Sequence, residues 1–531
     1  MHFFGHLENT FGVGMLSLRM QLAANGSGIM NPSVPGGIPL KNLFAGVPCD
    51  SFTGDKDKSV NAIITDSRRV VPGSLFFAIN GLRSDGNQFI HEAIDRGAVG
   101  IVSDVLNKHS ASHVSQIVVS NVRRTLGVIS RRFYGKPDES LNVIGITGTN
   151  GKSTVAMLTQ YLVSEPGGKA GLLGTVHYDL GGRTLPSYKT TPESVDSYAM
   201  FRQMLDSSCR HAVIEVSSHG IEQDRVYGMR IPVVAFLNLT KDHLDYHLDM
   251  EQYFAAKAKL FSGEIGNTPS TAVVNFDDSY GHRLLERIPG ETKTITFGLN
   301  CEAMIRAEAL QLSANGTQFQ LIWPEGRAQV TTSQLGAYNV SNILAALAIA
   351  YGSGFKIEPL LEKLPAFPGV PGRMERVKTG QAFNVLVDYA HTDDALRNAL
   401  TMLREITTGR IRVVFGCGGN RDRAKRALMT AVVQELADES WATSDNPRKE
   451  SIEAIFADMR TGVSMPDKIH FVTDRRQAIR QALEVAEAGD CVLIAGKGHE
   501  TFQEFADTVI PFDDRLVVRE LLAIKELGQK K

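Results

Sequence analysis

Short apolar runs rich in β-branched residues alternate with longer amphipathic stretches along most of this chain. The runs fall at residues 143–146, 211–216, 233–237, 385–387, 412–415 and 491–495. Helix-length stretches follow several of them, as at residues 153–163 and 394–406. Continuous apolar runs of this length are typical of strands buried on both faces, and strand–helix alternation builds parallel sheets. The pattern therefore predicts an α/β fold.

Two segments rich in proline and glycine, residues 134–140 and 364–372, have the composition of linkers between domains. They divide the 531 residues into three parts of ordinary domain size. We expect a smaller mixed α/β domain at 31–138, a central domain with a parallel sheet at 139–368 and a C-terminal domain at 369–531. Residues 1–30 are expected to form a disordered tail, or to precede a true start at Met30.

Charge and cysteine usage narrow the class of protein. Lys and Arg number 56 against 58 Asp and Glu, which argues against binding nucleic acid through bulk charge. The five cysteines are widely spaced with no CxxC, which disfavours a disulfide framework and fits a reducing cytoplasm. No run of 18 apolar residues occurs, so no membrane insertion is expected. We expect a monomeric cytoplasmic protein with small-molecule partners.

The segment IGITGTNGKST at residues 144–154 joins a predicted strand to a predicted helix through a glycine-rich turn. Gly148 and Gly151 would let backbone N–H groups approach phosphate oxygens, Lys152 would neutralise phosphate charge, and the Ser153 hydroxyl could bind Mg²⁺. The spacing is shorter than the Walker pattern, which would place glycine where Ile146 stands. We interpret the segment as a phosphate loop; the alternative is an ordinary strand-to-helix turn.

Two further polar segments follow predicted strands. Glu215 lies at the end of its apolar run, where it could hold Mg²⁺ directly or through water, or simply mark the strand end. His243 and His247 are four residues apart and could share a helix face, but no HExxH motif supplies a dedicated zinc site. In isolation, the favoured role of this segment is helix capping by Asp242.

Ten motifs along the chain resemble those of the Mur ligases, a family of peptidoglycan synthesis. They are TGTNGKST (147–154), EVSSHG (215–220), LNLTKDHLDYH (237–247), FAAKAKLF (254–261), YNVSN (338–342), PGRME (371–375), VDYAHTDDAL (387–396), GCGGNRDRAKR (416–426), SDNPR (444–448) and GKGHE (496–500). The resemblance covers residues 61–515 in the order of the family. It implies a first domain that holds a uridine nucleotide, a central ATPase and a Rossmann-like third domain that brings the amino acid.

The resemblance also implies a reaction. SDNPR together with GCGGNRDRAKR is most similar to the pattern for addition of meso-2,6-diaminopimelate to UDP-N-acetylmuramoyl-L-alanyl-D-glutamate. ATP would phosphorylate the D-glutamyl γ-carboxylate, the incoming amine would attack the acyl phosphate, and phosphate would leave. Such a step serves cell-wall precursor synthesis, and through it cell shape and cell division.

The ATPase roles follow from the resemblance residue by residue. Ser153 and Glu215 would hold one Mg²⁺, and His243 and a carbamylated Lys257 would hold a second. From the residues alone Lys257 would be a solvated helix lysine, and Lys259 is expected to point elsewhere on the helix. The ATP-binding set would comprise Gly148, Thr149, Asn150, Gly151, Lys152, Ser153 and Thr154, with Asn339 at the adenine and Arg373 and Asp388 at the ribose and phosphates. His391 is favoured as a structural or capping residue.

The resemblance assigns substrate residues in all three domains. Thr65 and Ser67 would meet the uridine diphosphate, and the contact of Lys189 is left open. The muramoyl-peptide set would be Thr190, Thr191, Ser217, Gln223 and Arg225, and the amino-acid set Arg421, Asp445, Asn446, Pro447, Arg448, Gly496 and Glu500. Arg448 decides between amino acids, because its planar fork suits the far carboxylate of diaminopimelate, which lysine lacks. Asp445 and Glu500 would hold the distal ammonium.

Three alternatives remain beside this interpretation. A lysine-adding Mur ligase or a ligase like folylpolyglutamate synthase would share the ATPase motifs, but SDNPR disfavours both. A P-loop NTPase that acts as a switch or a transporter motor would hydrolyse ATP without an amino acid, and it gives no account of the motifs in the third domain.

Overall fold

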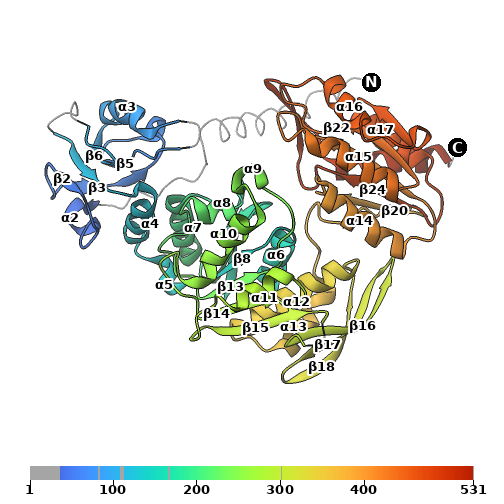
Figure 1. The fold of residues 1–531 in the computed structure, drawn as a ribbon, viewed down its shortest axis with the longest axis horizontal. Coiled ribbons are helices and arrows are strands. Elements are labelled where there is room, and N and C mark those ends of the chain that lie inside the picture. The colour runs from blue at the N-terminus through green and yellow to red at the C-terminus, as the bar shows by residue number, and fades with distance from the viewer. Residues whose placement is uncertain (1–35, 82–83, 108–112, 166–167, 301, 530–531) are drawn as a thin grey trace, which may run out of the picture. The chain divides into compact units, whose positions relative to one another are not determined.

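The computed structural model describes residues 36–81, 84–107, 113–165, 168–300 and 302–529, and its alternating strands and helices confirm the predicted α/β class (Figure 1). The expected tail at residues 1–30 lies outside the described residues. The chain divides into two compact units. One holds the chain up to Thr296 together with Ala346–Phe355, and the other holds Phe297–Ala345 and the chain from Lys356 onward. The expected domain boundaries at 138 and 368 stay a prediction.

The first unit begins with a five-stranded sheet in the order β2-β7-β6-β5-β4. Its strands are β2 (Ser51–Thr53), β4 (Ala62–Ile64), β5 (Ser74–Phe77), β6 (Ala98–Ser103) and β7 (Ser115–Val118). Strands β4 to β7 pair in parallel, and β2 adds an antiparallel edge. Helices α3 (Ile90–Asp95) and α4 (Val122–Phe133) belong to the same part, and α2 (Leu40–Leu43) follows the short strand β1 (Ile38–Pro39), which pairs antiparallel with β3 (Ser59–Val60).

The first expected linker is folded rather than irregular. Residues Pro137–Ser140 form the short helix α5, in which the proline takes the first helical position and forfeits no hydrogen bond. Asp138 is fully buried, accepts hydrogen bonds from Arg131 Nε at 2.8 and 3.0 Å, and accepts a third from the Arg230 backbone at 2.8 Å. Proline and glycine here mark a tight turn within a packed region.

A larger sheet follows in the order β11-β10-β9-β12-β8-β13-β14-β15. Its strands are β8 (Asn142–Thr147), β9 (Lys169–Leu173), β10 (His177–Asp179), β11 (Thr184–Pro186), β12 (Cys209–Glu215), β13 (Val233–Phe236), β14 (Thr271–Asn275) and β15 (Lys293–Gly298). The predicted strands β8, β12 and β13 pair in parallel, as their continuous apolar runs indicate. The helices of this part are α6 (Lys152–Val163), α7 (Ser194–Asp206), α8 (Ser218–Glu222), α9 (Leu244–His247), α10 (Met250–Ser262) and α11 (Ser279–Leu285).

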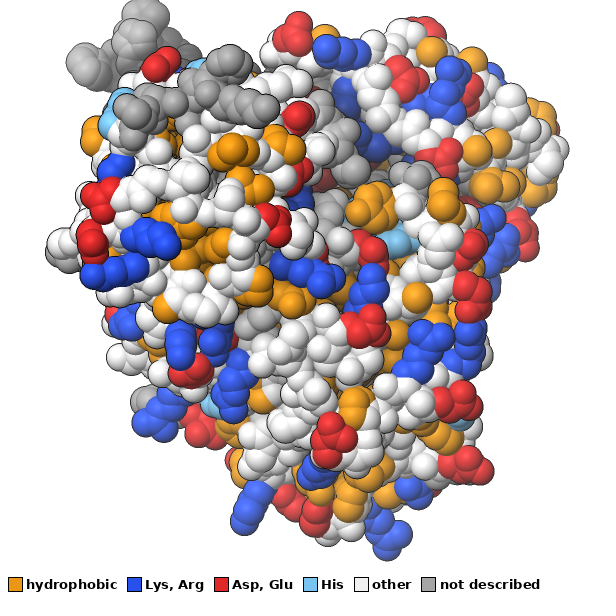
Figure 2. All heavy atoms as spheres, turned by 60° about the vertical axis from the view of Figure 1, so that its left-hand side comes forward, with side chains coloured by type: hydrophobic (Ala, Val, Ile, Leu, Met, Phe, Trp, Pro, Cys, Tyr) orange, Lys and Arg blue, Asp and Glu red, His pale blue; other side chains and the backbone are white. Residues whose placement is uncertain are grey.

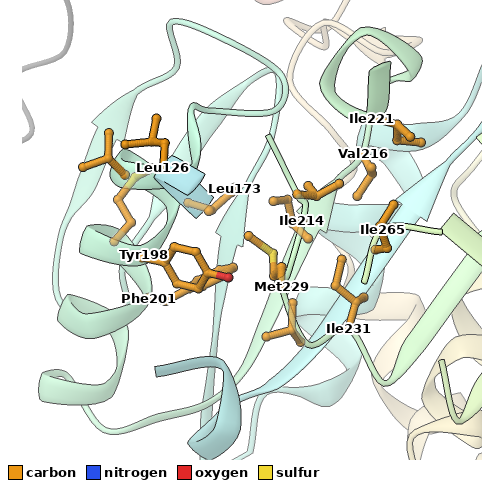
Figure 3. Close-up of a cluster of buried hydrophobic side chains, with 14 of the residues drawn as sticks. Leu126, Leu173, Tyr198, Phe201, Ile214, Val216, Ile221, Met229, Ile231 and Ile265 are labelled. Carbon is orange, nitrogen blue, oxygen red and sulfur yellow. The ribbon is translucent and has the colours of Figure 1, made fainter. Parts of the chain in front are cut away.

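One hydrophobic cluster runs through this unit (Figure 3). Leu126 of α4, Tyr198 and Phe201 of α7, and Leu173 of β9 all belong to it and are buried. Ile214 of β12, a strand of the larger sheet, belongs to the same cluster. Burial of large side chains from both sheets' helices in one cluster ties the first sheet to the second through apolar contact.

The second unit contains an antiparallel meander of β16 (Ile305–Ser313), β17 (Gly316–Trp323) and β18 (Gly326–Thr332). Helix α12 (Ala337–Gly352) begins in this unit, while its residues from Ala346 onward belong to the first unit; α13 (Ile357–Lys363) follows. The second expected linker contains a single 3₁₀ turn, Leu364–Ala366. The remaining chain forms a six-stranded sheet in the order β19-β20-β24-β21-β22-β23. Its strands are β19 (Glu375–Arg376), β20 (Asn384–Asp388), β21 (Ile411–Cys417), β22 (Glu439–Ser444), β23 (Ile469–Val472) and β24 (Cys491–Ala495).

Helices cover both faces of this six-stranded sheet, as a Rossmann-like fold requires. Along β24, Leu493 faces one apolar cluster and Val492 and Ile494 face another. The first cluster takes in α14 (Asp393–Ile406), α15 (Ala424–Leu436) and α16 (Ile452–Arg460), and the second α17 (Arg475–Glu484) and α18 (Asp514–Gln529). The period of two along a strand explains why these runs are apolar throughout.

Two surface properties bear on the expected partners. Among the described residues, every helix is too short or too polar to cross a membrane. On the face drawn in Figure 2, basic and acidic side chains are interspersed, in keeping with the near balance of 56 and 58.

A buried ion pair joins two strands of the six-stranded sheet that are not neighbours. Arg475 donates from Nε and Nη2 to Asp514 at 2.8 Å each, and both side chains are fully buried. The same guanidinium donates to the carbonyl of Ala495 at 2.9 Å and to that of Ser444 at 3.5 Å. These carbonyls end β24 and β22, which β21 separates.

Removing one partner of this pair should destabilise the C-terminal sheet. We expect Asp514→Asn to lower the free energy of unfolding by about 3 kcal/mol, because the Arg475 charge would stay buried without its carboxylate. Urea denaturation in a Trp323→Phe background would measure this, since Trp441 of β22 is then the only tryptophan. Asp507→Asn, at an exposed position, is the control; equal stability of the two variants would contradict the prediction.

Candidate active site

The glycine-rich segment forms a four-residue turn between β8, which ends at Thr147, and α6, which begins at Lys152. Gly151 has a left-handed φ of 84°, and a Cβ on Gly148 would lie 2.9 Å from Leu237 Cβ, so both positions favour glycine. Ile146, where the Walker pattern has glycine, is a buried residue of β8 and no part of the turn. The predicted strand–turn–helix is therefore confirmed, in a shorter form.

Neighbouring groups hold this turn in shape. The Asn238 side-chain oxygen accepts the backbone N–H groups of Thr149 at 3.1 Å and Asn150 at 2.8 Å. Lys152 Nζ donates to the carbonyls of Gly148 at 2.9 Å and Thr149 at 2.8 Å. Asn238 follows β13, the parallel neighbour of β8, so strand order brings it to the turn.

Glu215 lies at the carboxyl end of β12, opposite Ile146 of the parallel neighbour β8, and is 2% exposed. Its Oε2 accepts the Ser153 hydroxyl at 3.1 Å and the Thr175 hydroxyl at 3.1 Å, and its Oε1 accepts Thr175 N–H at 2.8 Å. The structure thus brings Glu215 and Ser153 together. Hydroxyl and carboxylate oxygens are the hard donors that suit Mg²⁺.

Lys257 is a buried residue of α10, 1% exposed, and not the solvated lysine that the local sequence favours. Its Nζ donates to the Gly148 carbonyl at 3.0 Å and contacts the Thr147 hydroxyl at 3.5 Å. Burial, together with the charge of Lys152, lowers the pKa of Lys257 well below its usual value. Lys259 points elsewhere, as expected, and pairs with Glu222 at 2.7 Å.

The histidine segment differs from the expectation. His243 has a left-handed φ of 55° and precedes α9, so it does not share a helix face with His247. His247 is buried, with Nε2 2.8 Å from Ser218 Oγ and its ring stacked on Tyr253. Helix capping by Asp242 is also wrong: its carboxylate accepts the N–H of His243 itself, and α9 has no side-chain cap.

The side chain that does cap a helix nearby is Asp249, which accepts Gln252 N–H at 2.8 Å at the start of α10. A capping prediction depends on which residue precedes the helix. In α9 that residue is His243, in the left-handed conformation, and not Asp242. His243 keeps 45% of its side chain exposed, 3.4 Å from Asp242.

The residues assigned to the muramoyl peptide lie together. Thr191 Oγ1 donates to the Glu215 carbonyl at 2.8 Å, accepts Ser217 N–H at 2.9 Å and lies 3.1 Å from Ser217 Oγ. Thr190 Oγ1 is 2.9 Å from the Thr175 hydroxyl that contacts Glu215. Arg225 donates to the Thr191 carbonyl at 2.9 Å and to Gln223 Oε1 at 2.5 Å.

Glu193 is a member of this group that sequence reasoning missed. It forms ion pairs with Lys189 at 2.9 Å, Arg123 at 3.1 Å and Arg225 at 3.2 Å. Burial alone would raise the pKa of Glu193, but the three cations, Arg225 first, hold it below its usual value. Its position directly after TTP in the chain was the available signal. Lys189, whose contact the resemblance left open, pairs with Glu193.

In the first sheet, Thr65 follows β4 and Ser67 opens a 3₁₀ turn capped by Asp66. Ser67 is buried and donates from Oγ to Glu92 Oε2 at 2.6 Å. The two predicted residues thus lie at the carboxyl end of a parallel strand, where α/β sheets bind ligands.

The second unit holds the other expected ATP contacts. Asp388 ends β20 and accepts the N–H groups of Met374 at 2.7 Å and Ala390 at 2.8 Å; burial raises the pKa of Asp388, against the charge of Arg373. The Arg373 guanidinium lies 4.6 Å from the centre of the Tyr389 ring. Asn339, on α12, donates to the Leu335 carbonyl at 2.9 Å.

His391 contacts its own backbone neighbour, with ring Nδ1 2.8 Å from the Tyr389 carbonyl oxygen. Its side chain is exposed at the entry to α14. Such a local contact fits the structural role that the sequence favoured for His391.

The amino-acid motifs meet at the carboxyl ends of β21, β22 and β24. Asn446 donates from Nδ2 to Glu500 Oε2 at 2.9 Å, and Asp445 Oδ1 accepts Asn446 N–H at 2.7 Å. Gly419 N–H donates to the Asn446 carbonyl at 2.9 Å, and a Cβ on Gly419 would overlap the Pro447 carbonyl oxygen. Gly496 has φ 112° and donates to the Asp388 carbonyl at 3.1 Å.

Arg448 has a left-handed φ of 53° and is held on several sides. Its Nε pairs with Glu504 Oε2 at 2.9 Å, and its Nη1 donates to the Gly419 carbonyl at 3.0 Å. Its backbone N–H donates to the Glu504 carbonyl at 2.9 Å. Glu504 belongs to the hairpin of β25 (Phe502–Phe505) and β26 (Thr508–Pro511), which sequence reasoning did not assign.

Arg421, by contrast, is exposed and contacts only the Asn420 carbonyl at 3.2 Å among the described residues.

Two more buried cations form hydrogen bonds with residues of these motifs, although the resemblance gave neither of them a role. Arg426 is fully buried, pairs with Glu450 at 2.9 Å and Asp458 at 2.8 Å, and donates to the Gly418 carbonyl at 3.1 Å. Lys497 is also fully buried and contacts Asn446 and Glu500. Both lie inside quoted motifs, GCGGNRDRAKR and GKGHE, which was the signal available in the sequence.

Comparisons with known proteins match this chain over three successive ranges of residues. Family models match residues 59–134 (Mur ligase family, catalytic domain), 146–350 (Mur ligase middle domain) and 372–498 (Mur ligase, glutamate ligase domain). The UDP-N-acetylmuramoyl-L-alanyl-D-glutamate--2,6-diaminopimelate ligase of Solibacter usitatus is 44% identical over 464 residues, covering 87% of this chain and 93% of the relative. That of Geobacillus kaustophilus is 44% identical over 477 residues, covering 88% and 95%. A solved structure of a protein with this name is 32% identical, with a TM-score of 0.67 over 92% of this chain and 99% of that one.

Proposed function

This chain belongs to the Mur ligase family, and from that premise we propose that it is the ATP-dependent ligase that adds meso-2,6-diaminopimelate to UDP-N-acetylmuramoyl-L-alanyl-D-glutamate. The observation that carries the proposal is the cluster of Asp445, Asn446, Arg448 and Glu500 at one edge of the C-terminal sheet. Its charges complement an amino acid with an extra ammonium and an extra carboxylate at its far end. The product is a peptidoglycan precursor.

The proposed ATP site is the glycine-rich turn of residues 148–151, called the phosphate turn below. Backbone N–H groups in the first turn of α6 would face the phosphates, where the helix dipole favours an anion, whereas those of Thr149 and Asn150 are bonded to Asn238. Lys152 exchanges its contacts with the Gly148 and Thr149 carbonyls for phosphate oxygens. Thr154 stands in the first turn of α6, and Asn339, Arg373 and Asp388 remain proposed contacts for the adenosine part.

The Ser153 hydroxyl and the Glu215 carboxylate fit Mg²⁺, although no group of three His, Cys, Asp or Glu side chains among the described residues is placed to hold a metal ion. Ser153 and Glu215 already share a hydrogen bond, and His243 keeps its side chain partly exposed. Mg²⁺ supplies charge neutralisation to the phosphates when it is bound. A protonated Lys257 would repel such a cation, so its role requires a change of charge.

We place a carbamate on Lys257 because its buried amine favours the neutral form. The lone pair of neutral Nζ attacks the carbon of CO₂, an N–C bond forms, and one proton leaves to solvent. The product is an anion with two oxygens, which are ligands that Mg²⁺ accepts. The contact of Nζ with the Gly148 carbonyl at 3.0 Å puts this group beside the phosphate turn.

The central sheet supplies the proposed acceptor site. Arg225, held by Thr191 and Gln223, presents a planar fork to a carboxylate of the muramoyl peptide. Thr190, Thr191 and Ser217 add hydroxyl groups beside Glu215. Thr65 and Ser67 of the first sheet would hold the uridine diphosphate through backbone and hydroxyl groups.

Bond formation then follows from ordinary acyl chemistry. The γ-carboxylate of D-glutamate takes the γ-phosphoryl group of ATP, which gives an acyl phosphate and ADP. The neutral amine of diaminopimelate attacks the acyl carbon, and the tetrahedral intermediate expels phosphate and loses a proton. Positioning and charge, rather than a covalent enzyme intermediate, carry the proposed catalysis. We place the reaction in the cytoplasm and treat the enzyme as a monomer.

The choice of amino acid is the most direct test. We expect phosphate release from ATP with UDP-N-acetylmuramoyl-L-alanyl-D-glutamate and meso-diaminopimelate, and at least about 100-fold lower kcat/KM with lysine, because lysine has no far carboxylate for the Arg448 guanidinium to bind. A coupled phosphate assay measures both. Equal or better turnover with lysine would favour the lysine-adding alternative, and ATP hydrolysis without any amino acid would favour an NTPase.

Arg448→Ala should weaken one substrate selectively. We expect the KM for diaminopimelate to rise by about 30-fold or more, because a carboxylate loses its charged partner, while the KM values for ATP and the uridine nucleotide stay within about twofold. Arg476→Ala is the matched control, since that arginine pairs with Glu520 on the surface of the same unit. Equal loss for all three substrates would contradict the assignment.

Lys257→Ala should be nearly inactive, because the variant cannot carry a carbamate. We expect a loss of kcat of at least about 1,000-fold, with partial recovery when formate or acetate supplies the missing carboxylate oxygens. A ¹³C NMR carbamate signal from the wild-type protein in ¹³C-bicarbonate, lost in the variant, checks the modification directly. Lys259→Ala, which removes an exposed ion pair, should retain full activity; an active Lys257→Ala variant would refute the carbamate.

A further inference from the structure

Lys497 is a fully buried lysine in the middle of the amino-acid motifs. Its Nζ donates to Glu500 Oε2 at 2.9 Å and to Asn446 Oδ1 at 3.1 Å, and lies 5.6 Å from the centre of the Phe502 ring. Taking an ammonium group out of water is costly unless carboxylate and hydrogen-bond partners compensate. Both compensating partners here are residues proposed to bind the amino acid, whereas the proposed function gives Lys497 no task.

The contacts of Lys497 determine the orientation of the Asn446 amide. Asn446 Oδ1 accepts from Lys497 and also from the backbone N–H of Glu504 at 3.1 Å. An ammonium and a backbone N–H can only donate, so the oxygen of the amide must face them. Nδ2 is thereby directed to Glu500 Oε2, to which it donates at 2.9 Å. Lys497, Asn446 and Glu500 form a closed triangle of hydrogen bonds.

The same triangle leaves one oxygen of Glu500 for a ligand. Oε2 accepts from Lys497 and Asn446, whereas no hydrogen bond to Oε1 occurs among the described residues. The Glu500 side chain is 21% exposed, so Oε1 is within reach of solvent. Asp445 is joined to the same group, because its Oδ1 accepts the backbone N–H of Asn446 at 2.7 Å.

Among the ion pairs of the amino-acid residues, Arg448 is matched by Glu504 and Lys497 by Glu500, which leaves the carboxylate charge of Asp445. Asp445 and Glu500 contribute two negative charges, and Lys497 contributes one positive charge. The nearby Arg475 is already matched by Asp514. A ligand ammonium group supplies the missing positive charge, in a partly buried setting where an unpaired charge is expensive.

We propose that Lys497 is a positioning residue that builds the binding site for the distal ammonium of the amino acid: it holds Glu500 Oε2, fixes the Asn446 amide and leaves Glu500 Oε1 for the ligand. The inference rests on the proposed function, since it takes diaminopimelate as the amino acid. Lys497 does not touch the ligand, so it acts through Glu500. It makes the site selective for an amino acid with a positive charge at its far end.

The test compares two amino acids that differ only at this point. meso-Diaminopimelate carries the distal ammonium, whereas 2-aminopimelate keeps the distal carboxylate and lacks the amine. In Lys497→Met, which preserves length and removes charge, we expect the KM for diaminopimelate to rise by about 10-fold or more. The preference for diaminopimelate over 2-aminopimelate, as a ratio of kcat/KM values, should fall by a similar factor. The KM values for ATP and the uridine nucleotide should stay unchanged.

A double-mutant cycle shows whether Lys497 acts through Glu500. If it does, adding Lys497→Met to Glu500→Gln changes the preference by less than about twofold, because the positioned carboxylate is already absent. Arg412→Met is the matched control: it removes another buried cation of the same sheet, paired with Asp490 at the opposite ends of the strands. This control should lower the melting temperature and leave the preference intact.

Lys497→Arg serves if the methionine variant does not fold. It keeps the charge and displaces the donors, and we expect the KM for diaminopimelate to rise at least about threefold with the KM for ATP constant. An unchanged preference in Lys497→Met, equal loss with both amino acids, or an unchanged KM in a folded Lys497→Arg would overturn the inference alone. A wild-type protein that does not use diaminopimelate would overturn the proposed function as well.

Discussion

Parallel pairing of neighbouring strands determines where the candidate functional groups of this protein lie. Because β8 and β12 run side by side in the same direction, the turn after one strand meets the last residue of the other, and Ser153 reaches Glu215. In the C-terminal sheet, β21, β22 and β24 end at one edge, so segments 50 residues apart in sequence share hydrogen bonds there. Carboxyl ends of parallel strands are the ordinary ligand edge of α/β sheets.

Buried charges then hold these strand ends in place. Arg475 reaches the last carbonyls of β22 and β24, Arg426 supports Gly418, and Lys497 joins Asn446 to Glu500. Each of these cations is buried and paired with at least one carboxylate, so removing that carboxylate leaves a buried charge without compensation. The site therefore depends on a layer of ion pairs beneath the residues that face a ligand. Lys257 differs, because burial there lowers the pKa of its amine and favours the neutral form.

Several features of the fold and the site were predictable from local sequence. Apolar runs of three to six residues marked β8, β12, β13, β20, β21 and β24, since a strand covered on both faces needs no polar alternation. The glycines at 148 and 151 marked the turn before α6. Local reasoning failed where the backbone took an unusual conformation. His243 has a positive φ and precedes α9, so it shares no helix face with His247, and the expected capping of that helix by Asp242 is wrong.

The sequence by itself determined the fold class, the phosphate turn and the resemblance to a ligase family, because these depend on periodicity, glycine positions and ordered motifs. Only the tertiary structure decided which side chains are buried and what pairs with them. Lys257 and Lys259 are two residues apart on one helix, yet one is enclosed and the other pairs at the surface. Glu193, Glu504 and Lys497 acquired roles in the site from partners distant in sequence. Burial and long-range pairing depend on how strands and helices pack, and no local pattern records them.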